Sequence, residues 1–407
     1  MKNRLWTKNF TIITVGSAIS MFGDCLVYYA LGFTILERTG SSFLYSLFFV
    51  VVMLPMLFMP MLAGPYLDRF SRRKAIYTLD YVSSALFFIA AIVASSGFFN
   101  YIFYLIIGVF AGSVMAVYMV AYDSFYPMLI SEGNYSKAYS VSSLLYPLAN
   151  TIMAPVSAVA YQSLGLFPIF LIDAFSFLIA ASIETQIKQE ETQLMRNMSS
   201  TFNFKTELKE GIDYLKNNAG LKAITGYFML TMFVFGGVDM MMLPFFKSRC
   251  DLGVTKYAFV MSLETLGRIS GGIFHYKYIF KQDRKYRIAL FVYIVLTLMD
   301  VVVFFSPYYV MVVLLFVVGM LGVTSYNIRT SATQSYVPND KRGRFNSIFL
   351  VMTTAGQVLG QLSGGLLAEF FSIPYIVIGF CIINLFAVYY FIIRNSEDVK
   401  FIYNRQV

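Results

Sequence analysis

The chain has 407 residues, of which 58% are apolar and only 13% are charged. So few charged residues cannot cover the surface of a soluble protein this rich in Phe, Tyr and Met, so the composition excludes an ordinary soluble fold. The net charge of +9 would suit nucleic acid binding, but the positions of the basic residues along the chain argue against that function.

Long apolar segments without alternating polar residues predict transmembrane helices rather than a membrane barrel. A helix needs about 20 mostly apolar residues to cross a bilayer. In the first half of the chain this criterion predicts helices at roughly 10–36, 42–66, 75–97, 101–127, 138–162 and 167–187. In the second half it predicts helices at roughly 220–246, 256–279, 287–306, 309–332, 344–370 and 374–394.

The segments predict an all-α membrane protein of twelve transmembrane helices in two pseudo-symmetric six-helix bundles. The expected domains are an N-terminal bundle (1–187), a cytoplasmic linker (188–219), a C-terminal bundle (220–394) and a cytoplasmic tail (395–407). With both termini inside, 25 of the 31 Lys and Arg fall on cytoplasmic segments, as the positive-inside rule requires. We therefore expect a multi-pass protein of a bacterial cell membrane.

The sequence contains no pattern typical of a catalytic, cofactor or metal site. The cysteines Cys25, Cys250 and Cys381 are far apart and form no C-x-x-C pair, which argues against disulfides and zinc. No P-loop, G-x-S-x-G or H-E-x-x-H motif occurs, which argues against an ATP-driven pump or a hydrolase. We expect no enzyme activity, no cofactor and no metal.

The stretch "GPYLDRFSRRKAI" lies between the second and third predicted helices. It resembles the signature of the major facilitator superfamily, with Ser71 in place of the second glycine. The resemblance implies that this loop controls conformational change. Its residues are Gly64, Asp68, Arg69, Arg72 and Arg73. Asp68 is expected to cap a helix or to pair with a basic residue.

Three further stretches resemble the macrolide-efflux and multidrug-efflux branch of that superfamily. They are "FGDCLVYYALGFTILERTGSS", "LIDAFSFLIAASI" and "YVPNDKRGRFNSIF". The resemblance covers essentially the whole chain and implies export by alternating access. This sequence lacks two patterns that are common in proton-coupled members of the superfamily. The stretch "IIGVFAGSVMAVY" has no arginine, and Ala154 precedes Pro155 where a glycine is usual.

Ionisable residues within transmembrane helices indicate functional sites by default. Ser17, Ser20, Asp24 and Tyr28 share one helical face, and Asp239 is the counterpart of Asp24 in the second half. We predict that Asp24, Asp239 and Tyr28 face substrate and carry the coupling proton. The alternative is that Asp24 and Asp239 simply pair with Arg268 or Arg329.

The other intramembrane charges have structural interpretations. Asp80, Asp123 and Glu184 are expected near cytoplasmic helix ends, in reach of water or loop arginines. Glu264 and Arg268 are spaced to pair within one helix. Arg329 lacks an acid on its own helix, so we predict a switch in which its partner is Asp123. Asp173 and Asp300 are expected to form structural hydrogen bonds.

These observations predict a secondary transporter that exports amphiphilic drugs such as macrolides, driven by protons. Its expected partners are a small amphiphilic substrate, protons and the lipid bilayer, without nucleic acid, and the chain is expected to be a monomer. The alternatives are an exporter of an endogenous lipid, peptide or siderophore, or a membrane sensor that does not transport.

Overall fold

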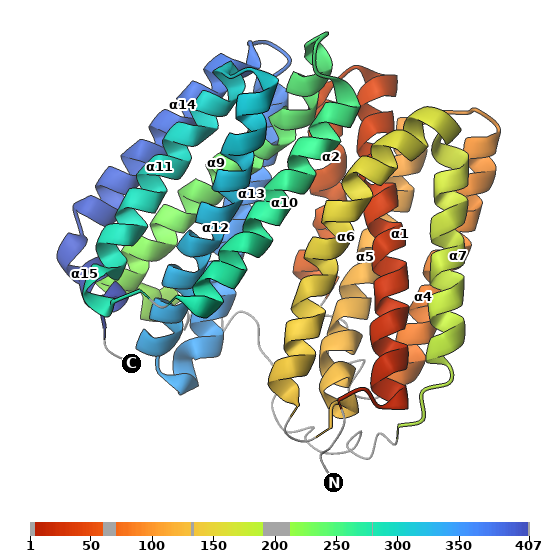
Figure 1. The fold of residues 1–407 in the computed structure, drawn as a ribbon, viewed down its shortest axis with the longest axis horizontal. Coiled ribbons are helices and arrows are strands. Elements are labelled where there is room, and N and C mark those ends of the chain that lie inside the picture. Colours follow the sequence, from red (N-terminus) through yellow and green to blue (C-terminus); the bar gives the residue numbers. More distant parts are fainter. Residues whose placement is uncertain (1–4, 60–70, 132–133, 190–211, 279, 406–407) are drawn as a thin grey trace. The chain divides into compact units, whose positions relative to one another are not determined.

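A computed structural model describes residues 5–59, 71–131, 134–189, 212–278 and 280–405. These residues are almost entirely helical (Figure 1). They divide into two compact units. Unit 1 comprises Met1–Gly40 and Phe48–Ser199, and unit 2 comprises Ser41–Leu47 and Ser200–Val407.

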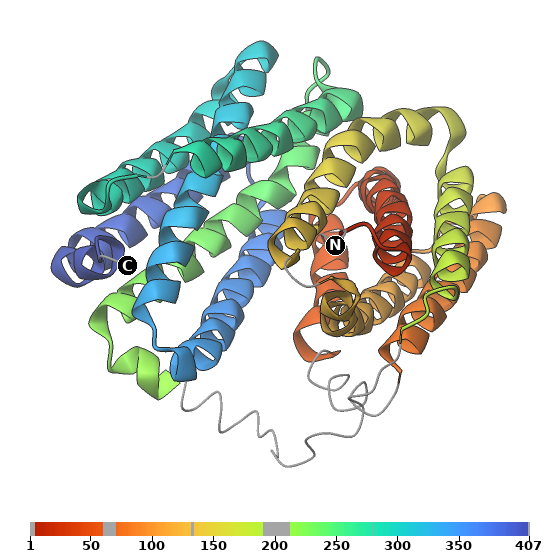
Figure 2. The same cartoon turned by 60° about the horizontal axis from the view of Figure 1, so that its bottom comes forward.

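Unit 1 is a bundle in which α1 packs against α6 and α7, and α4 packs against α5 and α7. Viewed from one end of the bundle, α1 lies among these helices (Figure 2). The helices wholly or partly in unit 1 are α1 (Lys8–Thr39), α2 (Ser42–Met53), α4 (Arg72–Ser95), α5 (Tyr101–Phe125), the 3-10 turn η1 (Tyr126–Leu129), α6 (Tyr135–Leu164) and α7 (Leu166–Glu184).

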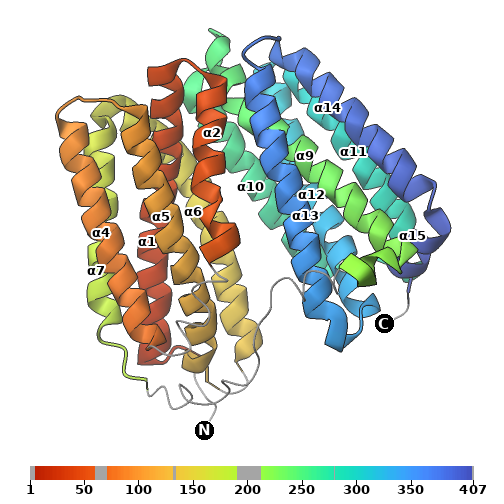
Figure 3. The same ribbon diagram turned by 180° about the vertical axis from the view of Figure 1, so that it is seen from behind.

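Unit 2 is built around α9, which packs against α13 and α14 (Figure 3), while α12 packs against α10 and α11. Its described helices are α9 (Ala219–Ser248), α10 (Gly253–Lys277), the 3-10 turn η2 (Gln282–Arg284), α11 (Lys285–Phe305), α12 (Tyr308–Tyr336), α13 (Asn339–Leu367), α14 (Ile373–Ala387), the π-helical η3 (Val388–Ile393) and α15 (Ser396–Tyr403).

Ten helices in the described part of the chain are long and apolar enough to cross a membrane. The sequence predicted twelve. The two further long helices are α10 and α13, with 25 and 29 residues. Both are more polar than the others, because α10 carries Glu264 and Arg268 and α13 begins with "NDKRGR". Long helices that carry charges lie in a membrane only when those charges face protein or water.

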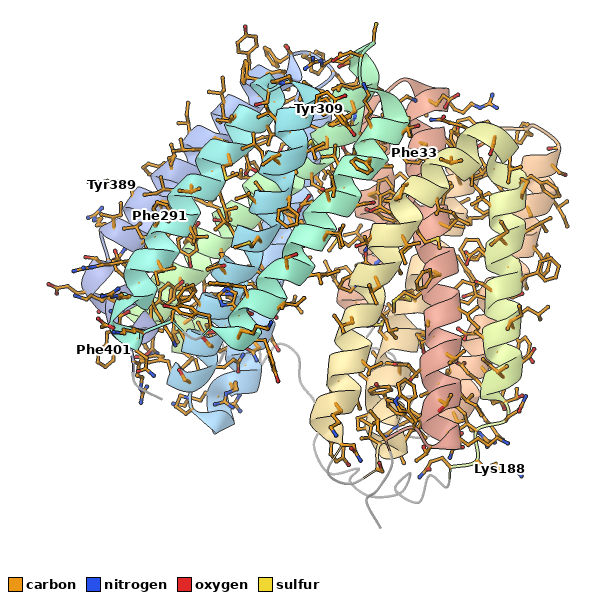
Figure 4. The ribbon with its side chains drawn as sticks, viewed as in Figure 1. Phe33, Lys188, Phe291, Tyr309, Tyr389 and Phe401 are labelled. Atoms are coloured by element: carbon orange, nitrogen blue, oxygen red, sulfur yellow. The ribbon has the colours of Figure 1, made fainter. Side chains whose placement is uncertain are left out.

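Large apolar side chains lie on the outer surface of unit 2, as a lipid-facing surface requires. Phe291 on α11 and Tyr389 on η3 are 64% and 60% exposed, and both point away from the bundle (Figure 4). Surfaces of this kind are stable in hydrocarbon and unstable in water.

The helix ends are determined by local capping. Thr7 caps α1 by accepting a hydrogen bond from the Phe10 N–H, and Asn100 caps α5 by accepting one from Phe103, as short polar side chains do at helix starts. Gly40 ends α1 with a left-handed φ of 64°, a conformation that favours glycine. Two prolines inside α6, Pro147 and Pro155, remove backbone donors and account for the bend of this helix in Figure 2.

The C-terminal segment, predicted as a cytoplasmic tail at 395–407, contains a helix. Ser396–Tyr403 forms α15, which packs against α9 and buries Val399, Ile402 and Tyr403. The Tyr403 hydroxyl lies 2.8 Å from that of Tyr293. The expected linker 188–219 lies mostly outside the described residues.

The first turn of α2 belongs to unit 2 and is held by Glu369, just beyond α13. One carboxylate oxygen of Glu369 accepts hydrogen bonds from the Ser41 hydroxyl at 2.7 Å and from the Phe43 N–H at 2.9 Å. The Ser41 hydroxyl oxygen also accepts a bond from the Leu44 N–H. A carboxylate at a helix start satisfies free N–H groups and interacts favourably with the helix dipole.

Because Glu369 caps α2, we predict that the first turn of α2 becomes less stable at acidic pH. The Phe43 N–H, followed by the Ser41 hydroxyl, holds the pKa of Glu369 below its usual value. A lowered pKa stabilises the folded contact above the ordinary pKa, and this contribution is lost as pH falls through the lowered value. Amide hydrogen exchange at Phe43 and Leu44, corrected for intrinsic rates, is expected to accelerate at acidic pH. Glu369→Gln should remove that pH dependence, whereas Glu397→Gln on α15 should keep it; an unchanged profile in Glu369→Gln would contradict the assignment.

Candidate functional site

Asp24 lies at the middle of α1 and faces α4 and α7. It is partly exposed, and its electrostatic neighbours include the carboxyls of Asp80 and Asp173 and the thiol of Cys25. Gly23 makes this approach possible, because a Cβ there would collide with the side chains of Asp173 and Ser176. The lack of a side chain at Gly23 therefore brings two acidic residues from different helices together.

The second pair of carboxyls lies nearer the end of the bundle. Asp80 on α4 and Glu184 on α7 are each 1% exposed, and their carboxyls are within hydrogen-bonding reach of each other. A Cβ on Gly16 would lie 2.7 Å from Oε1 of Glu184. The prediction that water or loop arginines serve these two acids is wrong for the described structure: Glu184 ends its helix, but its side chain turns into the α1–α4–α7 interface.

The predicted polar face of α1 is divided between interior and surface. Ser17 and Ser20 are buried, and the Ser17 hydroxyl lies 3.2 Å from the Tyr118 hydroxyl on α5. Tyr28 is 47% exposed, and its ring packs 4.8 Å from that of Phe49. The buried part of this face therefore bonds to α5 and to the α1 backbone, while Tyr28 presents an aromatic ring at the surface of unit 1.

Unit 2 has its own group of ionisable residues on α9, α10 and α11. Glu264 and Arg268 form an ion pair at 2.6 Å within α10. Asp239 on α9 interacts electrostatically with both, and Asp300 on α11 interacts with Glu264. Arg268 is the only cation among these four residues. Its positive charge partly neutralises the negative charge of the three neighbouring acids.

Glycines place the ion pair against α12. A Cβ on Gly267 would collide with the Phe316 carbonyl oxygen, and a Cβ on Gly319 would collide with the Glu264 carbonyl oxygen. Small residues allow such close helix approach in membranes. The α10–α12 contact therefore fixes the backbone that carries Glu264 and Arg268.

Arg268→Ala is expected to lower the thermal unfolding midpoint, because it leaves Glu264 beside Asp239 and Asp300 without its cation. Removing the second charge as well should recover part of the loss, so Arg268→Ala with Glu264→Gln should be more stable than Arg268→Ala alone. The measurement is thermal unfolding of the purified protein. Equal midpoints for the single and double variants would show that the unpaired charge of Glu264 does not cause the loss of stability.

Arg329 on α12 lies among aromatic rings of its own unit. Its guanidinium carbon is 4.4 Å from the centroid of Phe349, 5.2 Å from that of Tyr326 and 5.3 Å from that of Phe228. Its buried Nε has no hydrogen-bond partner in the described part of the chain. Asp123, its predicted partner, is an exposed residue of α5 in unit 1, so the pairing of these two residues stays a prediction.

The loop motif is only partly described. Gly64, Asp68 and Arg69 lie outside the described residues. Ser71 caps α4 by accepting a hydrogen bond from the Lys74 N–H. Arg72 donates to the Ser124 carbonyl at 3.3 Å and Arg73 to the Ile187 carbonyl at 2.5 Å, so these arginines bind carbonyls near the ends of α5 and α7.

A pocket of unit 1 lies away from these residues. It has a volume of about 720 Å³ and is lined near the ends of five helices by Glu37, Arg38, Phe98, Tyr104 and Tyr161 among others. None of the predicted site residues lines it. The described residues also contain no group of three or more His, Cys, Asp or Glu that could hold a metal ion.

The sequence interpretation did not assign a functional role to Asp80, Asp173, Glu184 or Asp300. One signal in the sequence pointed to two of them, Asp173 and Glu184: Gly16 and Gly23 are seven residues apart, hence on one face of α1. Each leaves room for a carboxyl of α7. A glycine pair at that spacing indicates a helix that approaches closely at that face, although it does not say which side chains fill the space.

Two bacterial proteins are similar in sequence. Over 233 residues the chain is 28% identical to macrolide efflux protein A of Streptococcus pyogenes, covering 56% of each chain. Over 277 residues it is 22% identical to the uncharacterized MFS-type transporter YkuC of Bacillus subtilis, covering 65% of this chain and 64% of that one. The alignments thus span less than two thirds of either relative.

Solved transporters share the fold. A bacterial homologue of the iron transporter ferroportin, in its inward-facing state, has a TM-score of 0.74 at 15% identity, covering 99% of this chain and 100% of that one. A mutant of the nucleoside transporter NupG has a TM-score of 0.75 at 13% identity, covering 95% and 100%. Identities this low establish only the fold, which is the all-helical, multi-span fold of the major facilitator superfamily.

A family model described as "Transmembrane secretion effector" (MFS_3) matches residues 4–401. The chain therefore belongs to this family of the major facilitator superfamily, whose members are multi-pass secondary transporters of small substrates rather than enzymes.

Proposed function

We propose that the protein exports amphiphilic drugs such as macrolides from a bacterial cell in exchange for protons. The observation that carries the proposal is Asp24, a partly exposed carboxyl at the middle of α1 whose described electrostatic neighbours include two further carboxyls. The similarity to macrolide efflux protein A supports the substrate class. Exchange proceeds by alternating access, with both termini cytoplasmic and the chain acting as a monomer.

A carboxyl in this position suits competition between a proton and a cationic substrate. Its ionised form is unfavourable in a desolvated setting, so it binds either a proton or another cation. Asp239 takes the same role on α9, where Arg268 lowers the local negative charge. Tyr28 offers an aromatic face to an apolar cation.

The proton gradient limits the substrate concentration ratio that the exporter can maintain across the membrane. A proton moving through about 100 mV releases roughly 2.3 kcal/mol, and each 1.4 kcal/mol corresponds to about a tenfold ratio. For a substrate without net charge, one proton per substrate therefore sustains a concentration ratio of roughly 50-fold from the potential alone. Exchange of one proton for one singly charged cation moves no net charge, so it is driven by the pH difference instead.

The test uses a bacterium that lacks its main drug exporters and expresses this chain. Cells with the protein should accumulate less radiolabelled erythromycin than cells with an empty vector, and a protonophore should abolish the difference. Asp398→Asn, at an exposed position of α15, serves as the matched control and should behave as wild type. Equal erythromycin accumulation with and without the protein would contradict the proposal for macrolides.

A second candidate is export of an anionic amphiphile such as a lipid. It is favoured by Arg329, whose guanidinium lies among three aromatic rings and has no carboxylate partner in the described residues of unit 2. A cation beside apolar rings suits an anionic head on an apolar body. Binding of a fluorescent acidic lipid that is lost in Arg329→Gln would support this candidate, and unchanged binding would contradict it.

A further inference from the structure

We propose that Glu184 and Asp80 form a proton-sharing carboxyl pair that connects one end of unit 1 to Asp24 through the α1–α4–α7 interface. This inference rests on the proposed proton coupling, and it assigns the route of the proton within one unit. The pair does not include the residues predicted to face substrate. From the sequence alone, its two acids are expected near helix ends and without a role in transport.

The contact between the two carboxyls requires a proton. Neither oxygen of Glu184, nor Oδ2 of Asp80, has a hydrogen-bond donor among the described residues. Both side chains are 1% exposed, so bulk water does not satisfy their oxygens. Two carboxylates cannot bond to each other, because both are only acceptors. Their contact is satisfied when one of them is protonated and donates to the other, as in carboxyl pairs that share one proton.

The bundle is built to hold this pair. Gly16 leaves space on α1, and a Cβ there would stand 2.7 Å from Oε1 of Glu184. The Ser84 hydroxyl on α4, one turn beyond Asp80, donates to the Ala174 carbonyl on α7 at 2.8 Å. The Gly16 contact positions α1 beside Glu184, and the Ser84 bond joins α4 to α7 near Asp173, so the three helices that surround the pair are held together.

The pair is connected to both the helix ends and the middle of α1. Arg73 at the start of α4 donates to the carbonyl of Ile187, three residues after Glu184, so Glu184 lies one turn from the polar end of the unit. In the other direction, Asp80 interacts with Asp24 and Asp173. Gly16 and Gly23 are seven residues apart, so the two carboxyl levels are separated by roughly 10 Å along α1.

A proton crosses this distance in steps that each break one O–H bond and form another. Water at the helix ends protonates Glu184, which donates to the carboxylate of Asp80. Asp80 then passes the proton to its electrostatic neighbour Asp24, and Glu184 is reprotonated from water. The titratable and charged groups facing this route are Asp24 and Cys25 on α1, Arg73 and Asp80 on α4, Tyr118 and Tyr122 on α5, and Asp173 and Glu184 on α7.

A proton rather than a metal ion is the ligand that fits. The described residues contain no group of three or more acidic, His or Cys side chains arranged for a metal ion. A proton needs only the two oxygens in contact.

The first test is infrared spectroscopy of the purified full-length protein as pH is raised. The wild type should lose a band of protonated carboxylic acid, and Glu184→Gln and Asp80→Asn should each lack that change. Asp398→Asn removes an exposed acid of α15 and should retain it. A wild-type spectrum without such a band, or an unchanged band in both interface variants, would overturn the proposal.

A second test needs no variant. Dicyclohexylcarbodiimide reacts with protonated carboxyls in apolar surroundings, so wild-type protein should be labelled on Glu184 or Asp80 at acidic pH and lose the label at alkaline pH. Labelling that is absent from both residues at every pH would contradict the shared proton.

Transport measurements in proteoliposomes separate this inference from the proposed function. Glu184→Gln should slow proton-driven efflux of erythromycin at least about tenfold but leave erythromycin exchange without a proton gradient within about twofold. If the wild type moves erythromycin without protons, the proposed coupling fails. If the wild type is proton-coupled and Glu184→Gln keeps its full rate, the route through the pair fails.

Discussion

Asp24→Asn is expected to abolish proton-driven efflux of erythromycin while the protein still folds. Binding of the cationic drug should weaken, because the carboxylate proposed to attract it is gone. Asparagine has nearly the same shape as aspartate but cannot exchange a proton. Asp80 on α4 and Asp173 on α7 are among the electrostatic neighbours of Asp24, so the variant also removes one titratable carboxyl from this acidic group. The rate of uphill efflux should fall by roughly 100-fold.

The matched control is Asp24→Glu, which keeps a titratable carboxyl and should retain measurable efflux. Folding is checked by size-exclusion chromatography, and binding by quenching of the single tryptophan, Trp6, or by retention of radiolabelled erythromycin. If Asp24→Asn confers the same drug resistance as the wild type, Asp24 is not the coupling carboxyl.

Gly360→Ala is expected to unfold or strongly destabilise unit 2. A Cβ at Gly360 on α13 would occupy the position of the Phe233 carbonyl oxygen on α9, and Gly356 and Gly364 make similar contacts one turn to either side. A backbone carbonyl cannot rotate away from the added Cβ as a flexible side chain could, so α9 and α13 must move apart. Strain of this kind costs about 3 kcal/mol.

The control for this prediction is Gly379→Ala on α14, where an added Cβ would meet open space. Alanine favours helix over glycine by about 1 kcal/mol, so Gly379→Ala should leave the unfolding midpoint unchanged or raise it. Thermal unfolding measures both variants. A Gly360→Ala protein as stable as Gly379→Ala would show that α9 and α13 pack less closely than described.

Much of the fold was predictable from the sequence because hydrocarbon imposes strong constraints on it. Runs of about 20 apolar residues predict helices directly, and "GPYLDRFSRRKAI" resembled the family signature. Polar helices are harder to assign by composition: α10 carries the Glu264–Arg268 pair, so its average hydropathy understates how much of it lies among other helices. The spacing of that pair was visible in the sequence, since residues four apart share a helix face.

The acidic interface of unit 1 was less predictable. Position along a helix indicates depth, and by depth Glu184 belongs to a helix end. Its burial depends on which way the side chain turns, and that direction is set by the absence of a side chain at Gly16 on another helix. The contact joins residues 168 positions apart, a relation that periodicity within one helix does not contain. Arg329 is similar, because its aromatic neighbours Phe228 and Phe349 come from α9 and α13.

Proton movement driven by substrate tests the central claim most directly. Purified protein is reconstituted into vesicles that contain a pH indicator, and an erythromycin gradient is imposed without a proton gradient. We expect erythromycin to drive protons in the opposite direction in wild-type vesicles, and we expect no proton flux in Asp24→Asn vesicles or in vesicles without protein. Erythromycin transport by the wild type with no accompanying proton flux would contradict the account.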